Sequence, residues 1–156
     1  MKLLIKQKFF SIGDSYDVFD ESGNVMFTVK SVFDFGHHFR IFDAIGYEVG
    51  SIRQKMLSWK TRFDMFIGDE YKGCITKEFT FFRPSFKIDY IGWQIEGNWL
   101  EWDYTIVDPS CMSVARVSKE IRNWSDTYVI DVYDSTNVVY ALMLVLAIDA
   151  EKDTRN

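Results

Sequence analysis

Apolar and polar residues alternate with a period of two along most of this chain. The alternation comes in short segments separated by turn-forming residues, which is typical of strands with one buried face. Glu21-Ser22-Gly23-Asn24 forms one such turn, because glycine and asparagine adopt positive φ at little cost. The pattern predicts about six strands in each half of the chain. The clearest segments are 16–20, 25–30, 39–43, 48–55 and 61–67, then 75–79, 86–96, 102–107, 112–119 and 127–133.

Residues 138–148 break the alternation, because all eleven of them are apolar or aromatic. Asp134, Ser135 or Thr136 can cap this segment as a helix. Its whole circumference is apolar, so no face suits water. Eleven residues reach only about 17 Å as a helix, against roughly 30 Å for a bilayer core. We therefore expect a helix surrounded by protein, at about 135–150, and no transmembrane segment.

The chain also repeats itself at an offset of 65 residues. Asp43 aligns with Asp108 and Trp59 aligns with Trp124, with no gap between them. Upstream, Ile5 aligns with Ile75, and Gly23-Asn24 aligns with Gly97-Asn98 if a loop is shortened. This predicts a single domain over 1–156, built from two copies at about 1–68 and 71–133. A closed barrel of about twelve strands is too wide for its own side chains to fill, and an apolar helix would fill it.

Composition supports a packed domain and narrows the function. The chain has 156 residues, of which 47% are hydrophobic and 17% aromatic, so it can build a core. The net charge of −5 argues against nucleic acid as a partner. Lys6 and Lys8 interrupt the apolar start of the chain, which is unlike a signal peptide. We expect a cytoplasmic protein that can lie at the periphery of a membrane.

Motifs for catalysis or metal binding are not found. Cys74 and Cys111 lie far apart and form no C-x-x-C pair, so two buried free thiols are expected. His37 and His38 would chelate poorly on a strand and are expected in a plain loop. The chain has no G-x-S-x-G elbow and no glycine-rich phosphate loop. Two carboxylates that meet only in the fold would escape this search. We expect no cofactor, no metal and no enzyme activity.

Five segments stand out: YDVFDESGN at 16–24, FTVK at 27–30, VARVSKE at 114–120, WSDTYVIDV at 124–132 and the helix that ends in Ala147-Ile148-Asp149. Together they resemble the LURP-one-related family and its bacterial YxjI-type members. The resemblance covers nearly the whole chain. It implies a tubby C-terminal-like fold, in which a twelve-stranded barrel built by duplication encloses a C-terminal helix. Tubby domains bind phosphoinositides and the related phospholipid scramblases act at membranes, but no site residue can be transferred by position. The proline-rich leader and cysteine-rich stretch of scramblases are absent.

The best candidate site is both basic and aromatic. Its residues surround one predicted hairpin, with the cations facing outward and the tryptophan near the tip: Arg53, Lys55, Trp59, Lys60 and Arg62. Cations beside an interfacial tryptophan suit anionic lipid headgroups or phosphorylated ligands. The second copy offers Arg116, Lys119, Arg122 and Trp124. Alternatively, both tryptophans cap the ends of the barrel and the cations are ordinary surface charge.

We therefore expect a non-catalytic binding module for an anionic phospholipid headgroup or a phosphorylated small molecule. The alternative is an interaction or scaffold protein that recognises another protein through a face of the barrel. A compact basic concavity favours the first function, and a flat apolar patch favours the second.

Overall fold

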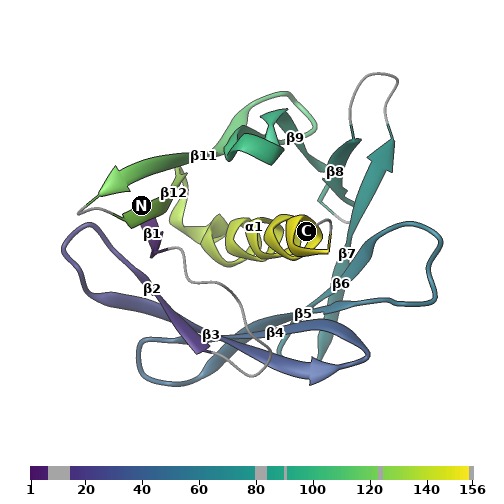
Figure 1. Ribbon diagram of the computed structural model, residues 1–156, viewed down its shortest axis with the longest axis horizontal. Helices are drawn as coiled ribbons and strands as arrows, with labels where there is room; N and C mark the ends of the chain where they lie inside the picture. The colour runs from purple at the N-terminus through teal and green to yellow at the C-terminus, as the bar shows by residue number, and fades with distance from the viewer. Residues whose placement is uncertain (7–14, 80–83, 90, 123–124, 155–156) are drawn as a thin grey trace.

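The computed structural model describes residues 1–6, 15–79, 84–89, 91–122 and 125–154, and it is a closed antiparallel barrel around one helix (Figure 1). The strands follow one another around the barrel in chain order, and β1 pairs with β12 to close the ring. The predicted fold class is therefore confirmed. The strands are β1 (Lys2–Lys6), β2 (Ser15–Phe19), β3 (Val25–Asp34), β4 (Gly36–Asp43), β5 (Glu48–Gln54), β6 (Arg62–Ile67), β7 (Glu70–Phe79), β8 (Pro84–Ile88), β9 (Trp93–Asn98), β10 (Asp103–Val107), β11 (Ser113–Arg122) and β12 (Ser125–Val132).

Alternation of buried and exposed residues turns these segments into strands of a barrel. In β1, Leu3 and Ile5 point inward while their neighbours are more exposed, as a period of two requires. Leu3 lies opposite Ile130 of β12, and the amino group of Met1 donates to the carbonyl oxygen of Val132 at 2.8 Å. Closure gives every strand a hydrogen-bonded neighbour on both sides, which limits edge-to-edge aggregation.

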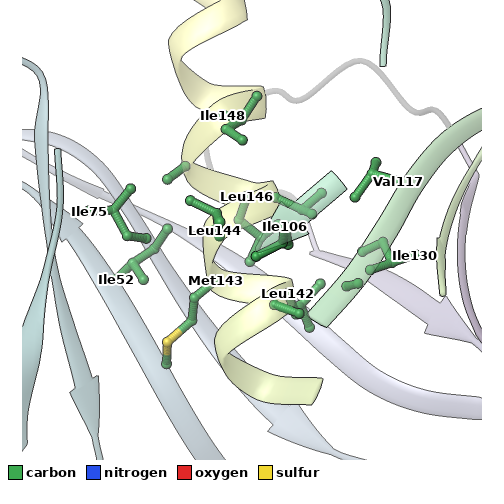
Figure 2. Packing of buried hydrophobic residues seen from close by; sticks show 14 of the residues in the cluster. Ile52, Ile75, Ile106, Val117, Ile130, Leu142, Met143, Leu144, Leu146 and Ile148 are labelled. Atoms are coloured by element: carbon green, nitrogen blue, oxygen red, sulfur yellow. The ribbon is translucent and has the colours of Figure 1, made fainter. Parts of the chain in front are cut away.

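The helix α1 (Val138–Asp153) runs through the barrel interior. A 3-10 turn, η2 (Ser135–Asn137), leads into it, and the Asp134 side chain accepts a hydrogen bond from the backbone N–H of Thr136 at 2.9 Å. Figure 2 shows the apolar side chains of α1 between strands from both halves of the chain. On one side lie Ile52 and Ile75, and on the other lie Val117 and Ile130. Every residue from 141 to 148 is buried, and each large apolar side chain among them contributes about 1.5–3 kcal/mol to stability.

Three local predictions are wrong. The segment 86–96 is not one strand, because β8 and β9 are joined by a turn in which Gly92 has a φ of +70°. The same apolar alternation continues on both sides of that turn and conceals it. His37 and His38 lie on β4 rather than in a loop. Gly23 lies in the β2–β3 turn while Gly97 lies within β9, so the gapped part of the repeat alignment fails.

The aligned aspartates of the repeat, by contrast, build the same turn. Asp43 accepts hydrogen bonds from the backbone N–H groups of Ile45 and Tyr47 at 3.1 and 2.9 Å. Asp108 accepts from the N–H groups of Ser110 and Met112 at 2.8 and 3.0 Å. The predicted boundary between the copies falls between β6 and β7, so each copy supplies six of the twelve strands. Superposition of residues 1–68 on 71–133 stays a prediction.

The two ends of the barrel differ. We call the end where α1 begins the proximal rim and the end where α1 terminates the distal rim. Because the strands are antiparallel, the β3–β4, β5–β6 and β9–β10 connections all lie at the distal rim. Contacts confirm this placement, since Nζ of Lys152 near the end of α1 donates to the carbonyl oxygen of Leu100 between β9 and β10.

Candidate functional site

The predicted site residues lie on β5, on β6 and in the connection between them, at the distal rim. Arg53 and Lys55 are exposed. Trp59 is 88% exposed, so it does not cap the barrel. Nζ of Lys60 lies 4.8 Å from the centroid of the Trp59 ring, in a cation–π contact. All five predicted residues therefore lie along the β5–β6 hairpin, where Arg53, Lys55 and Trp59 are exposed.

Arg62 has a different role. Its Nε donates to Oδ1 of Asp64 at 2.9 Å, and one terminal nitrogen donates to the hydroxyl of Tyr71 at 3.1 Å. The hydrogen bond with Asp64 raises the pKa of Arg62, so this arginine stays charged. Its positive charge is paired with the Asp64 carboxylate. Arg62 therefore neutralises an acid beside the other predicted site residues.

Apolar residues that sequence reasoning did not select surround these cations. Phe35 at the β3–β4 tip is 91% exposed, and Met56 and Leu57 in the β5–β6 connection are 56% and 99% exposed. The two hairpins lie side by side, because the backbone N–H of His37 donates to Oε1 of Gln54 at 3.1 Å. We define the distal patch as the apolar residues Phe35, Met56, Leu57 and Trp59 together with the cations Arg53, Lys55 and Lys60. Three apolar residues within a predicted turn were the signal that could have revealed it.

A groove lies within the distal patch, and a hollow adjoins it. The groove has a volume of about 500 Å³, and it is lined by Phe35, Arg53, Gln54, Lys55, Met56, Leu57 and Asp64. The hollow has a volume of about 350 Å³, and it is lined by His38, Arg40, Glu48, Ser51, Arg53, Phe66, Gly68 and Asp69. Arg53 lies between the two and belongs to both.

The cations of the second copy are engaged by acids. Arg116 pairs with Asp103 and also donates to the hydroxyl of Thr105 at 3.0 Å. Nζ of Lys119 lies 2.6 Å from Oδ2 of Asp126. The side chain of Arg122 and the whole of Trp124 fall outside the described residues. The repeat therefore carries its basic and aromatic pattern into the second copy without a comparable exposed cluster among the residues described.

A group of polar residues lies below the distal rim where α1 ends. Lys77 and Glu151 are both buried and form an ion pair, and the Thr61 hydroxyl donates to the second oxygen of Glu151 at 3.0 Å. Burial, with a smaller contribution from Asp153, raises the pKa of Asp149 to about 7. Burial lowers the pKa of Lys152 to about 8. Sequence reasoning missed this group, because its members come from distant strands.

Other candidate chemistry finds little support in the described part of the chain. Within it, no three His, Cys, Asp or Glu side chains gather as a metal site would require. Both cysteines are free thiols, but only Cys74 is buried as predicted, whereas Cys111 is exposed. His37 stacks on Phe39 with ring centroids 6.0 Å apart.

None of the helices described is both long enough and apolar enough to cross a membrane.

Comparison with known proteins identifies relatives over almost the whole chain. The model of the LURP-one-related family matches residues 1–149. The uncharacterised protein YxjI of Bacillus subtilis is 27% identical over 150 residues, which cover 96% of this chain and 92% of YxjI. An X-ray structure of a protein from Arabidopsis thaliana matches with a TM-score of 0.64 at 16% identity, over 95% of this chain and 90% of that one. The fold is therefore tubby C-terminal-like, as the resemblance implied.

Proposed function

This chain belongs to the LURP-one-related family, and we propose that it is a non-catalytic module that binds anionic headgroups at a phospholipid surface. The observation that carries the proposal is the distal patch. Leu57 and Trp59 are 99% and 88% exposed, and the cations Arg53, Lys55 and Lys60 flank them.

The physical chemistry of a bilayer surface suits this arrangement. Tryptophan favours the membrane–water interface, where its ring is partly buried and its N–H stays hydrated. Each lysine or arginine near an anionic leaflet contributes about 1 kcal/mol. Moving leucine and phenylalanine side chains from water to the acyl boundary is favourable, by a free energy of about 25 cal/mol per Å² of apolar surface. Apolar tips ringed by cations would therefore bind such a surface cooperatively.

Co-sedimentation with vesicles tests the proposal. We expect the protein to pellet with vesicles of phosphatidylcholine and phosphatidylglycerol at low salt, and to stay in the supernatant with phosphatidylcholine alone. The double variant Lys55→Glu/Lys60→Glu should keep its melting temperature and lose sedimentation. The matched control is Lys2→Glu/Lys72→Glu, which changes the net charge equally at positions outside the distal patch. An equal loss of sedimentation in both variants would show that net charge, and not the distal patch, causes the binding.

Trp59 supplies an independent readout. Its indole should shift to shorter emission wavelengths on binding, and the difference between the wild type and Trp59→Phe isolates that signal. If the wild-type protein does not sediment with anionic vesicles at low salt, the lipid function is wrong. The exposed apolar tips would then favour the protein-partner function, because patches of this kind also mark protein interfaces.

A further inference from the structure

The groove within the distal patch has the dimensions and lining of a site for one molecule. Its volume is about 500 Å³, within the range of about 300–1,000 Å³ that small-molecule pockets occupy. Phe35, Met56 and Leu57 form its apolar lining. A Cβ at Gly36 would come within 2.7 Å of Sδ of Met56, so the glycine lets the methionine pack against the neighbouring hairpin. Methionine is a flexible side chain that adapts to variable ligands.

One edge of the groove is cationic. Arg53 and Lys55 are two positions apart, so an extended backbone sends both side chains to the same side. Among the described residues, Lys55 makes no ion pair. The acid of the groove, Asp64, is neutralised by Arg62 at 2.9 Å. The groove therefore presents a net positive edge beside an apolar lining.

The hollow that adjoins the groove extends the polar side. Arg53 lines both, and His38 and Ser51 supply further polar groups in the hollow. Arg40 there is held by Glu48 at 2.6 Å. A ligand with an anionic head at Arg53 and an apolar chain against Phe35, Met56 and Leu57 would match both surfaces at once.

We propose that the groove binds a single-chain anionic amphiphile, of the alkyl phosphate or lysophosphatidate class, with its phosphate at Arg53 and Lys55. This rests on the proposed function and deepens it, because it assigns one lipid molecule to a defined site beside the membrane-facing tips. Surface insertion alone would require the exposed tips but no one-to-one binding of a free amphiphile.

Dodecyl phosphate below its micellar concentration is the probe. In isothermal titration calorimetry we expect dodecyl phosphate to bind one-to-one. Inorganic phosphate, which lacks the alkyl chain, and dodecyl maltoside, which lacks the anionic head, should each bind with an affinity lower by about tenfold or more. The double variant Arg53→Gln/Lys55→Gln should lower the affinity for dodecyl phosphate by a similar factor. Phe35→Ser/Leu57→Ser should do the same, whereas Ile45→Ser/Tyr47→Ser, at exposed apolar positions of the proximal rim, should not.

Methionine methyl NMR places the ligand. The methyl group of Met56 in the groove should shift on addition of dodecyl phosphate, while that of Met112, which is 65% exposed at the proximal rim, should not. Equal affinity for dodecyl maltoside would overturn the proposal, as would an unmoved Met56 signal. If an acidic leucine-containing peptide binds and dodecyl phosphate does not, the groove is a protein-docking surface and the proposal is wrong.

Vesicle sedimentation separates this inference from the proposed function. A protein that sediments with anionic vesicles but does not bind dodecyl phosphate keeps the membrane function and loses the groove site. A protein that binds dodecyl phosphate but does not sediment keeps the groove site and loses the membrane function. If the protein neither sediments with anionic vesicles nor binds dodecyl phosphate, the membrane function and the groove site are both wrong.

Discussion

Three turns at the proximal rim share one construction. In each, an aspartate accepts hydrogen bonds from the N–H groups two and four residues later, and the residue three positions later has a positive φ. The aspartates are Asp20, Asp43 and Asp108. The positive-φ residues are Gly23, Gly46 and Cys111, with φ values of +84°, +94° and +61°. Only the third turn places a side chain where glycine is favoured.

Replacing Cys111 by glycine should therefore stabilise the protein. A non-glycine residue in the left-handed region costs about 1–2 kcal/mol, part of which is offset because glycine makes the unfolded chain more flexible. We expect a gain of about 1 kcal/mol and a rise in melting temperature of about 2–4 °C. Cys111→Ala is the control, because it removes the thiol and keeps the Cβ. An equal gain from alanine would show that backbone strain is not the cause.

Asp149 should make stability depend on pH. It faces Tyr16, Tyr104 and Tyr128 from the strands, and Lys152 and Asp153 from its own helix. Burial raises its pKa from 3.8 to about 7, so the folded state holds the proton more tightly than the unfolded state. This contribution is fully present below pH 4 and is lost as pH rises to about 7, by an amount on the order of a few kcal/mol.

The variant Asp149→Asn isolates this effect, because it keeps the shape and removes the titration. We expect the variant to melt at a higher temperature than the wild type at pH 8 and at a similar temperature at pH 4. Thermal melts from pH 4 to pH 8 measure the difference in melting temperature between the variant and the wild type. The contributions of Asp153 and Lys152 are common to both proteins and cancel in this difference. Parallel curves for the two proteins would contradict the assignment to Asp149.

At the scale of elements, α1 joins the barrel through a buried ion pair as well as through its apolar surface. Lys77 of β7 and Glu151 of α1 are 5% and 6% exposed and pair with each other. Nζ of Lys77 also lies 5.8 Å from the centroid of the Trp99 ring. The pair holds the last turns of α1 close to β7, near the distal rim.

Breaking that pair should be costly. Lys77→Met leaves the Glu151 carboxylate buried without its cation, which costs about 3–5 kcal/mol. The double variant Lys77→Met/Glu151→Leu removes both charges and should recover much of that loss. Urea denaturation of the two variants and the wild type measures the three stabilities. A single variant within about 0.5 kcal/mol of the wild type would show that water reaches Glu151.

The elements were predictable where local pattern determines them. Residues 138–148 have no polar face, so a buried helix follows from the sequence, but its continuation to Asp153 depends on a partner from another strand. The candidate site divides in the same way. Its cations were found because they are close in sequence. The groove was not, because Phe35 meets Met56 and Leu57 only when two hairpins lie side by side.

At the scale of the whole molecule, charge is distributed unevenly between the rims. Each of the six connections at the proximal rim contains an aspartate or directly follows one: Asp20, Asp43, Asp69, Asp89, Asp108 and Asp134. These six carboxylates lie at the end of the barrel opposite the distal patch. If the proposed function holds, an anionic surface would repel the proximal rim and attract the cations of the distal patch, so the end of α1 would face the membrane.

The two cysteines allow this orientation to be tested. Cys111 is exposed at the proximal rim, whereas Cys74 is buried, and burial raises the pKa of its thiol and slows labelling. A polarity-sensitive fluorophore on Cys111 should stay accessible to iodide when anionic vesicles are added. The same fluorophore on Leu57→Cys, in a Cys111→Gly background, should shift to the blue and become protected. Both responses should fade with salt, since the screening length falls from about 10 Å at 0.1 M to about 3 Å at 1 M. Protection at position 111 without protection at 57 would mean that the proximal rim binds, and the charge argument would be wrong.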